Sequence, residues 1–162
     1  MILIAFGSNL NSKVFGSPLN NCMEGIRLIG ENFSVSKVSK LYETEPIPKS
    51  NQPWYINGVV EINTTLHPFD ILKKLLILEK SLGRKREFKN EARIIDFDLL
   101  CYDDLVMKTT ELELPHPRIH MRSFVLKPIC DIDPAWSHPI IKKRADVLLK
   151  SLSNQKIFLK KT

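Results

Sequence analysis

The clearest hydrophobic pattern in the chain is the alternation of apolar and polar side chains from Trp54 to Asn63. Because successive side chains of a strand point to opposite faces, this alternation predicts a strand with one apolar face. That face carries Trp54, Ile56, Val60 and Ile62, and the other carries Tyr55, Asn57, Val59 and Glu61. An apolar run predicts a buried strand at 2–6, and a looser alternation predicts another at 33–42.

Helical spacing appears between and after these strands. It predicts helices at 20–29, 68–82 and 144–152. Pro68 suits a first helical position, and Gly83 suits the residue after a helix. Prolines at 46, 48 and 53 predict a loop, and the segment 105–114 is predicted to be extended. Because strands and helices alternate irregularly, the pattern favours an α+β fold with helices against a mostly antiparallel sheet.

The composition is that of an ordinary globular domain, and we expect one domain over residues 1–162. Cys22, Cys101 and Cys130 are odd in number and lack metal-type spacing, which favours a reducing compartment. With no leader pattern and no long apolar run, we expect a cytoplasmic protein without membrane contact. We also expect a monomer. The net charge of +6 allows an anionic partner, although part of it lies at 156–161, which we expect to be a solvated tail.

Two aspartates interrupt the apolar segment that ends at Leu100. In a strand, Asp96 and Asp98 share one face with roughly 6 to 7 Å between their Cα atoms, and neighbours such as Phe97 point the other way. Two like charges at that separation favour a cation between them. A surface strand that carries two aspartates by chance explains the pair equally well, so the surrounding sequence has to decide.

The segment before this strand is basic, with five Lys or Arg residues between 84 and 93 and no apolar periodicity. Mg²⁺ in proteins combines one or two carboxylates with phosphate oxygens. Carboxylates beside a basic loop therefore favour a divalent metal bound to a polyphosphate.

Other polar residues each allow a structural interpretation beside a functional one. Glu79 falls on the leucine stripe of the predicted helix, either as a buried group with a partner or as an edge side chain that reaches water. His116 lies between two prolines, where a turn residue is more common than a ligand contact. Tyr55 alone is more often sheet packing, but beside Asn57 it combines an aromatic ring with a donating and accepting amide, as a planar heterocycle requires.

Six motifs follow one another over nearly the whole chain. They are Gly7-Ser8-Asn9-Leu10, Tyr42-Glu43-Thr44-Glu45-Pro46, Gln52-Pro53-Trp54-Tyr55-Ile56-Asn57, Leu78-Glu79 through Gly83-Arg84, Arg93-Ile94-Ile95-Asp96-Phe97-Asp98, and Pro115-His116-Pro117-Arg118 through Arg122-Ser123-Phe124-Val125-Leu126. Together they resemble the 6-hydroxymethyl-7,8-dihydropterin pyrophosphokinase family. The resemblance implies a ferredoxin-like α+β sandwich. It also implies transfer of the terminal diphosphate of ATP to the dihydropterin hydroxymethyl group, with release of AMP, in folate biosynthesis.

The resemblance also implies the roles of individual residues. Asp96 and Asp98 would hold two Mg²⁺ ions on the ATP phosphates, and with Arg84 and Arg93 they form the predicted catalytic group. The predicted ATP contacts are Glu79, Arg84, Arg86, Arg93, Leu99, His116 and Arg122. The predicted pterin contacts are Thr44, Glu45, Ile47, Tyr55, Asn57 and Phe124. The sequence does not separate two roles for Asp98, as proton acceptor or as metal ligand.

One departure from the family pattern lies next to the predicted site. Many members carry Gly-Pro where this chain has Glu91-Ala92, and we expect the loop to close over its ligands differently. The main alternative function is a small basic ferredoxin-like nucleic-acid-binding or regulatory domain. Such a domain places aromatic and cationic residues on an exposed sheet face, which Asp96 and Asp98 interrupt here, so we expect no nucleic-acid partner. A catalytically inactive relative is a second alternative, disfavoured by the retained acids, arginines and pocket residues.

Overall fold

The computed structural model of the protein describes residues 1–83 and 92–161. Its elements, in chain order, are β1 (Ile2–Ser8), α1 (Pro18–Asn32), β2 (Ser34–Val38), β3 (Tyr42–Thr44), β4 (Tyr55–Asn63), α2 (Pro68–Ser81), β5 (Asp96–Tyr102), β6 (Met107–Lys108), β7 (Glu113–Leu114), the 3₁₀ helix η1 (Ile119–Met121), α3 (Ser123–Ile132), α4 (Ala145–Lys150) and β8 (Ile157–Leu159). The mixture of helices and strands confirms the predicted α+β class.

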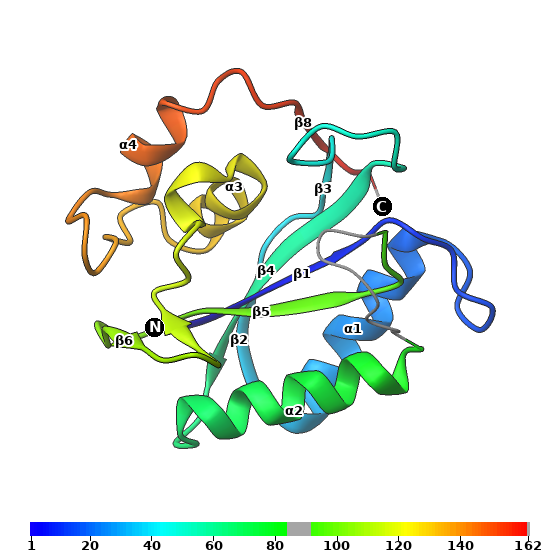
Figure 1. The fold of residues 1–162 in the computed structure, drawn as a ribbon, viewed down its shortest axis with the longest axis horizontal. Coiled ribbons are helices and arrows are strands. Elements are labelled where there is room, and N and C mark those ends of the chain that lie inside the picture. Colours follow the sequence, from blue (N-terminus) through cyan, green and yellow to red (C-terminus); the bar gives the residue numbers. More distant parts are fainter. Residues whose placement is uncertain (84–91, 162) are drawn as a thin grey trace.

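The strands form one main sheet in the order β5-β1-β4-β3-β8, and β2 also pairs with β4. Each of these pairings is antiparallel. In Figure 1, α1 and α2 lie on one side of the sheet and α3 and α4 on the other. This arrangement confirms the predicted sandwich, in which helices flank a mostly antiparallel sheet.

The two faces of the sheet bury different apolar clusters. On β4, Ile56 and Val60 pack with α1 and α2, whereas Val59 packs with α3 and α4. On β5, Phe97 and Leu99 join the first of these clusters. The side-chain faces predicted from the alternation are therefore confirmed for both strands. Polar residues between these positions, such as Asn57 on β4, then face the α3 side.

The segment 33–42 is not one strand, as predicted, but two. β2 and β3 both pair with β4, and residues 39–41 interrupt the ladder between them. Ser39 Oγ accepts a hydrogen bond from Val59 N at 2.9 Å, and Lys40 N donates to Asp131 Oδ2 at 3.2 Å. The interruption arises because Val59 N bonds to a side chain, and Lys40 N bonds to Asp131 of the distant helix α3 (Ser123–Ile132), in place of strand-to-strand hydrogen bonds.

Two further expectations are corrected by the structure. The segment 105–114 is a hairpin of β6 and β7 and not one extended segment, because Thr109 N donates to Leu112 O at 3.0 Å and turns the chain. The basic end of the chain is not a solvated tail throughout. Residues 157–159 form β8, which pairs with the otherwise open edge of β3.

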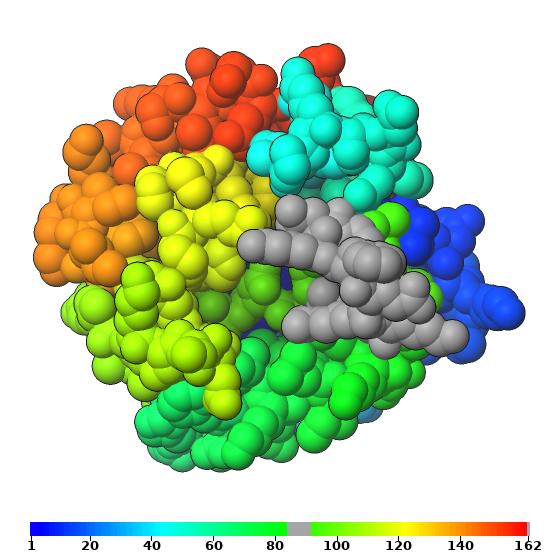
Figure 2. Space-filling view, viewed as in Figure 1, coloured from blue at the N-terminus to red at the C-terminus, as the bar shows by residue number. Residues whose placement is uncertain are grey.

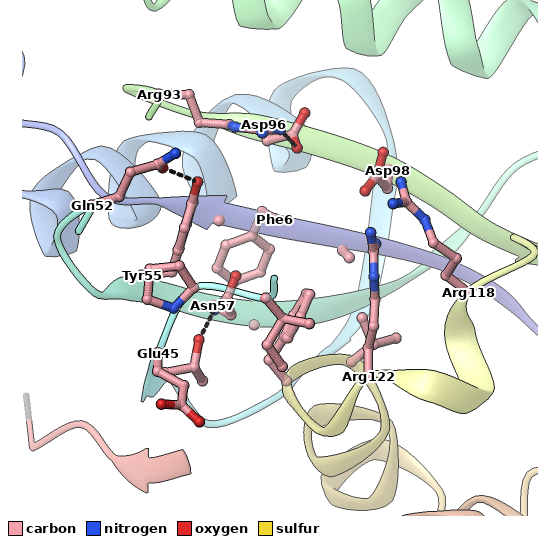
Figure 3. Close-up of a pocket in the computed structure, with 18 of the residues that line it drawn as sticks. Phe6, Glu45, Gln52, Tyr55, Asn57, Arg93, Asp96, Asp98, Arg118 and Arg122 are labelled. Atoms are coloured by element: carbon pink, nitrogen blue, oxygen red, sulfur yellow. Dashed lines mark hydrogen bonds and ion pairs between the residues drawn. The ribbon is translucent and has the colours of Figure 1, made fainter. Parts of the chain in front are cut away.

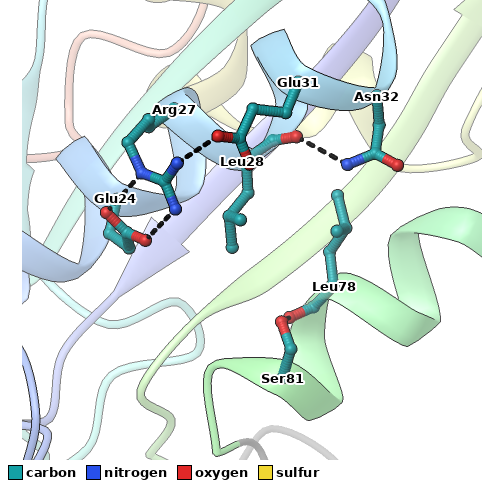
Figure 4. Close-up of polar contacts among 7 residues, drawn as sticks. All are labelled: Glu24, Arg27, Leu28, Glu31, Asn32, Leu78 and Ser81. Atoms are coloured by element: carbon teal, nitrogen blue, oxygen red, sulfur yellow. Dashed lines mark hydrogen bonds and ion pairs between the residues drawn. The ribbon is translucent and has the colours of Figure 1, made fainter.

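Local sequence explains where α1 begins and which ion pairs lie on its exposed side. α1 begins earlier than predicted, at Pro18, because Ser17 Oγ accepts a hydrogen bond from Asn20 N and caps it. On its exposed side, Arg27 pairs with both Glu24 and Glu31 (Figure 4). Such exposed pairs contribute about 0 to 1 kcal/mol each, so packing and not surface charge holds α1 in place. No helix among the described residues combines the length and apolarity needed to cross a membrane.

Candidate active site

A cavity of about 470 Å³ lies on the face of the sheet that α3 covers. Figure 2 shows this side of the molecule hollowed beside the residues of α3. Strands β1, β3, β4 and β5, the loop after β3, the residues on either side of η1, and α3 all contribute to it. The lining residues are Ala5, Phe6, Gly7, Thr44, Glu45, Pro46, Ile47, Pro48, Ser50, Gln52, Tyr55, Asn57, Gly58, Arg93, Asp96, Asp98, Arg118, Arg122, Phe124 and Val125.

One wall of the cavity is neutral and internally hydrogen-bonded. Asn57 Nδ2 donates to Thr44 Oγ1 at 2.7 Å, between side chains that are only 6% and 2% exposed. Gly7 lies opposite Asn57 in the sheet, and a Cβ on Gly7 would lie 2.4 Å from Asn57 Oδ1. The glycine therefore makes the room in which the Asn57 amide is held, which gives the first motif of the sequence a physical reason.

Asn9, from the same motif, ties the loops around the cavity together. Its Nδ2 donates to Pro53 O at 3.0 Å, and its Oδ1 accepts from Arg93 N at 2.8 Å. Asn9 N donates in turn to Arg93 O at 3.1 Å. The segment of Arg93 and the loop before Tyr55 are thus held at a fixed separation by one buried amide. The sequence motif indicated Asn9 but did not reveal this role.

The other wall is charged. Asp96 and Asp98 project from β5 towards the cavity, and the guanidinium ends of Arg118 and Arg122 point towards Asp98 (Figure 3). Arg93 Nη1 donates to Asp96 Oδ2, so this carboxylate is already paired with a cation. The predicted placement of both aspartates on one strand face is confirmed.

The surroundings shift the pKa values of the basic groups on this wall. Burial is the largest single influence on the pKa of Arg93 and lowers it, but the charges of Asp96, Tyr55 and Asp98 and the hydrogen bond to Asp96 together raise the pKa above its usual value. Burial and the neighbouring Arg118 charge lower the pKa of Arg122. Because an arginine stays protonated in proteins, both remain cations. The charged wall therefore brings mutually repelling guanidinium groups together, which an anionic ligand would relieve.

His116 lies against this arginine pair as a neutral imidazole. Burial, followed by the charges of Arg122 and Arg118, lowers its pKa to about 4. His116 Nδ1 accepts a hydrogen bond from Arg118 N at 3.1 Å, which leaves the ring proton on Nε2. His116 is not among the cavity-lining residues, so its predicted nucleotide contact stays a prediction.

Two predicted nucleotide residues have other surroundings. Glu79 is 2% exposed, and its Oε1 accepts a hydrogen bond from Phe97 N at 2.7 Å. This contact lies in the β5 backbone between Asp96 and Asp98, and it supports the first of the two interpretations of Glu79, a buried group with a partner. Leu99 lies in the apolar cluster under α1 and α2. Neither residue lines the cavity, so the structure does not bring these two to the predicted site.

The remaining predicted residues divide into two groups. Thr44, Glu45, Ile47, Tyr55, Asn57 and Phe124 all line the cavity, as expected for a common binding pocket. Arg84 and Arg86 lie outside the described residues, as does Glu91 of the departure from the family pattern.

The cavity lining also includes residues that were not predicted as site residues, among them Gln52 and Arg118. Gln52 Oε1 accepts a hydrogen bond from Tyr55 OH at 3.2 Å, and Arg118 faces Asp98 (Figure 3). Both stand in motifs that were recognised, but nothing in the sequence alone showed where these side chains point.

The donor set limits what kind of metal the site fits. Among residues 1–83 and 92–161, no group of three or more His, Cys, Asp or Glu side chains is arranged around a common point. A metal held entirely by protein ligands is therefore not supported there. Two carboxylates beside arginines instead fit Mg²⁺, which keeps waters and takes further oxygens from a phosphate ligand.

Comparison with known proteins gives a consistent result. The family described as 7,8-dihydro-6-hydroxymethylpterin-pyrophosphokinase (HPPK) matches residues 3–134. A 2-amino-4-hydroxy-6-hydroxymethyldihydropteridine pyrophosphokinase of Aquifex aeolicus is 34% identical over 142 residues, which cover 88% of this chain and 86% of that protein. The enzyme of the same name from Bacillus subtilis is 36% identical over 131 residues, covering 80% of this chain and 75% of that protein.

Other similar proteins are much longer. The Dictyostelium discoideum folic acid synthesis protein FOL1 is 32% identical over 154 residues, which cover 95% of this chain but only 23% of that protein. The wild-type HPPK-DHPS of Plasmodium falciparum with pteroate has a similar structure, with a TM-score of 0.71 at 14% identity, over 94% of this chain and 44% of that chain. At that identity the structural likeness supports the fold alone. The chain thus spans under half of several of the proteins that it resembles.

Proposed function

The chain belongs to the 7,8-dihydro-6-hydroxymethylpterin-pyrophosphokinase family, and from this premise we propose that it transfers the terminal diphosphate of ATP to 6-hydroxymethyl-7,8-dihydropterin, releasing AMP. The observation that carries the proposal is a single cavity with a neutral, hydrogen-bonding wall and a charged wall. These two walls match the two chemical parts of the reaction, a flat heterocycle and a polyphosphate.

The neutral wall would bind the pterin. Asn57 and Thr44 offer donors and acceptors in a fixed geometry, which suits the alternating donors and acceptors of a pterin edge. Tyr55 and Phe124 supply aromatic surface, and Ile47 is a further apolar lining residue. Glu45, the carboxylate next to Thr44, also lines the cavity and accepts a hydrogen bond from Lys156 N. An apolar cavity with few oriented polar groups is the usual form of a small-molecule site.

The charged wall would bind the ATP phosphates. Arg93 and Arg122 offer forked donors that match phosphate oxygens, and neutral His116 would donate through Nε2. Arg118, added by the structure, extends the same cationic surface. The resemblance places Arg84 and Arg86 with this group.

Asp96 and Asp98 would hold two Mg²⁺ ions together with the phosphates. When bound, Mg²⁺ neutralises charge on the transferred diphosphate and polarises the phosphorus under attack. The ion pair between Arg93 and Asp96 would open as this happens, since a metal and a guanidinium compete for the same carboxylate oxygen. Arg93 would then be available to bind phosphate. The same side chain would thus pair with Asp96 in the free protein and with the ATP phosphates in the complex.

The chain's contribution to rate would be positioning and electrostatic stabilisation. With the ring held by the neutral wall and the phosphates by the charged wall, the pterin hydroxyl is brought in line with the β-phosphorus of ATP. The arginines would stabilise charge on the transferred group and on departing AMP. This division assigns binding of the two substrates to different residues, which makes it testable.

We further propose that residues 1–162 form one domain, and that the protein acts as a cytoplasmic monomer. Cys22, Cys101 and Cys130 are all free thiols, which supports a reducing compartment. Size-exclusion chromatography with light scattering tests the monomer directly.

Separation of the nucleotide products by anion-exchange chromatography tests the reaction. With ATP, Mg²⁺ and the reduced pterin alcohol, we expect AMP in an amount equal to the pterin consumed, and none when the pterin or the metal is left out. ADP as the product, or AMP formed without the pterin, would contradict the proposal.

A further inference from the structure

The segment 155–159 touches both walls of the cavity, although it lies beyond the residues 3–134 that match the family. β8 pairs with β3, so that Ile157 lies opposite Thr44 of the neutral wall. Lys156 N donates to Glu45 Oε1 at 3.3 Å. Gln155, the residue before these, contacts the charged wall instead. A short segment near the end of the chain thus connects the two walls.

The Gln155 side chain makes two hydrogen bonds to the backbone on either side of Arg122. Its Oε1 accepts from Ser123 N at 2.8 Å, and its Nε2 donates to Met121 O at 2.8 Å. Both functional atoms of the amide are therefore used, each on a residue directly adjacent to Arg122.

These two hydrogen bonds lie at the start of α3, where the N-cap residue makes no capping hydrogen bond. Arg122 is the N-cap residue of α3, and its own side chain makes no capping hydrogen bond. It has extended backbone angles, φ −126° and ψ 107°, between the 3₁₀ helix η1 and α3. A helix leaves its first N–H groups without partners, and Gln155 supplies the missing acceptor. Arg122 is the residue with extended backbone angles between η1 and α3. Its backbone conformation therefore sets the direction in which its side chain points.

The Arg122 guanidinium reaches the cavity across a nearby aromatic ring. Its Cζ lies 5.3 Å from the centre of the Phe124 ring, and its end points towards Asp98 (Figure 3). A small rotation of the backbone at Arg122 would move this long side chain by a larger distance at its end. The two hydrogen bonds of the Gln155 side chain fix the backbone from which this charged side chain extends.

We propose that Gln155 is a positioning residue that fixes the Arg122 guanidinium in the charged wall. The inference rests on the proposed function, in which Arg122 binds the ATP phosphates. We expect its main effect on the nucleotide side, because its two hydrogen bonds flank Arg122. Phe124 of the neutral wall lies inside α3, and the contacts of residues 156–159 with that wall come from their backbone.

Gln155→Met tests this role, because methionine keeps the length of the side chain and removes both hydrogen bonds. We expect the KM for ATP to rise about tenfold, the scale of loss when a binding group is slightly misplaced, with the KM for the pterin changed by less than about twofold. Asn154→Ala, at the exposed neighbouring position, is the matched control and should leave both constants unchanged. An equal rise in both KM values, or no rise, would overturn the proposal.

A double-variant comparison asks whether Gln155 acts through Arg122. In an Arg122→Ala background, Gln155→Met should have no further effect on the KM for ATP, because the group that it positions is gone. The same tenfold rise in both backgrounds would contradict the proposal.

Two measurements separate positioning from a loss of stability and from a failure of the proposed function. Asp133→Ala removes a hydrogen bond at the opposite end of α3, to Ala135 N at 2.9 Å, and should lower stability without splitting the two KM values. Hydrogen exchange of the amides at 121–124 should be faster in Gln155→Met than in the unaltered protein. If the unaltered protein releases no AMP, the proposed function fails, but the exchange at 121–124 still decides whether Gln155 holds the backbone on both sides of Arg122. Unchanged exchange in Gln155→Met would refute this role of Gln155.

Discussion

The two walls of the cavity are built in different ways. On the neutral wall, Thr44 and Asn57 are hydrogen-bonded to each other in the interior of the sheet, and both are almost completely buried. On the charged wall, Asp96 and Asp98 stand on β5 at the end of the strand order, facing Arg118 and Arg122, which flank η1 before α3 begins. The first wall is complete in itself, whereas the second gathers charges from separate elements.

This difference matches the chemistry of the two proposed substrates. A heterocycle is recognised by donors and acceptors that must already be in place, because a misplaced buried polar group is costly. A polyphosphate with metal ions brings its own charges, which compensate the repulsion between the like charges on the wall. If the two walls serve two substrates, changes in one wall should affect one substrate selectively.

The largest effect is expected from Asp98→Ala on the charged wall. Loss of one carboxylate from the metal set should lower kcat by about 10³-fold or more, in line with the removal of a group that stabilises transition-state charge. Asp103→Ala is the matched control, because Asp103 follows the same strand but pairs with the chain's N-terminal amine. Steady-state kinetics of AMP release measure both variants. Near-normal turnover of Asp98→Ala would contradict the metal assignment.

Glu79 separates support of the charged wall from contact with its ligand. Glu79→Ala leaves the buried Phe97 N–H without its acceptor and should lower the free energy of unfolding by about 1 to 3 kcal/mol, measured by urea denaturation. Glu79→Gln keeps an acceptor oxygen and should be close to the unaltered protein in its KM for ATP. A large rise in that KM for Glu79→Gln would instead support the nucleotide contact that the family resemblance implies.

Gly7→Ala tests the neutral wall without removing any of its polar groups. The added methyl group would meet Asn57 Oδ1 at 2.4 Å, so the amide has to shift. We expect the KM for the pterin to rise about tenfold while the KM for ATP changes little, as for a binding group moved by a fraction of an ångström. Gly30→Ala is the control, since a Cβ there meets nothing within 4 Å. Equal changes in both KM values would show that the walls do not act separately.

The smallest expected effect is on the pH dependence of stability, through His116 beside the arginines of the charged wall. The pKa of His116 is lowered to about 4 in the folded protein from an ordinary value of 6.5, so between these pH values the unfolded chain binds a proton that the folded protein does not. The stabilising contribution is therefore present above pH 6.5 and is lost as the pH falls towards 4. His116→Gln should show a weaker loss of stability over that range in urea denaturation. The same pH dependence in both proteins would assign the effect to other groups.

Much of the sheet could be predicted because its signals are local. The alternation in β4 and the Asp-x-Asp pair in β5 follow from the two-residue period of a strand, and the structure confirms their faces. The break at residues 39–41 could not be predicted in this way, because it depends on Asp131 of a distant helix. β8 likewise forms because β3 offers an open edge, which the basic sequence around it does not indicate.

The site shows the same division between local and distant causes. Residue types and motifs indicated Tyr55 and Asn57 on β4 and the two aspartates on β5. In each pair the two-residue spacing alone puts both side chains on the same face of their strand. Arg118 and Gln155 were not predicted as site residues, since the direction of a turn side chain and a contact across 32 residues depend on how η1 and α3 pack. Glu79 was noticed as a buried carboxylate, but only the structure showed that its partner is the β5 backbone.

Phosphorus NMR of the complete reaction tests the central claim most directly. The purified protein, Mg²⁺, ATP and the reduced pterin alcohol are combined, and the phosphorus signals are followed with time. The two-wall account predicts that the ATP signals are replaced by those of AMP and of a diphosphate ester on the hydroxymethyl oxygen of the pterin. Signals of ADP with a pterin monophosphate, or of free inorganic diphosphate with an unchanged pterin, would contradict it.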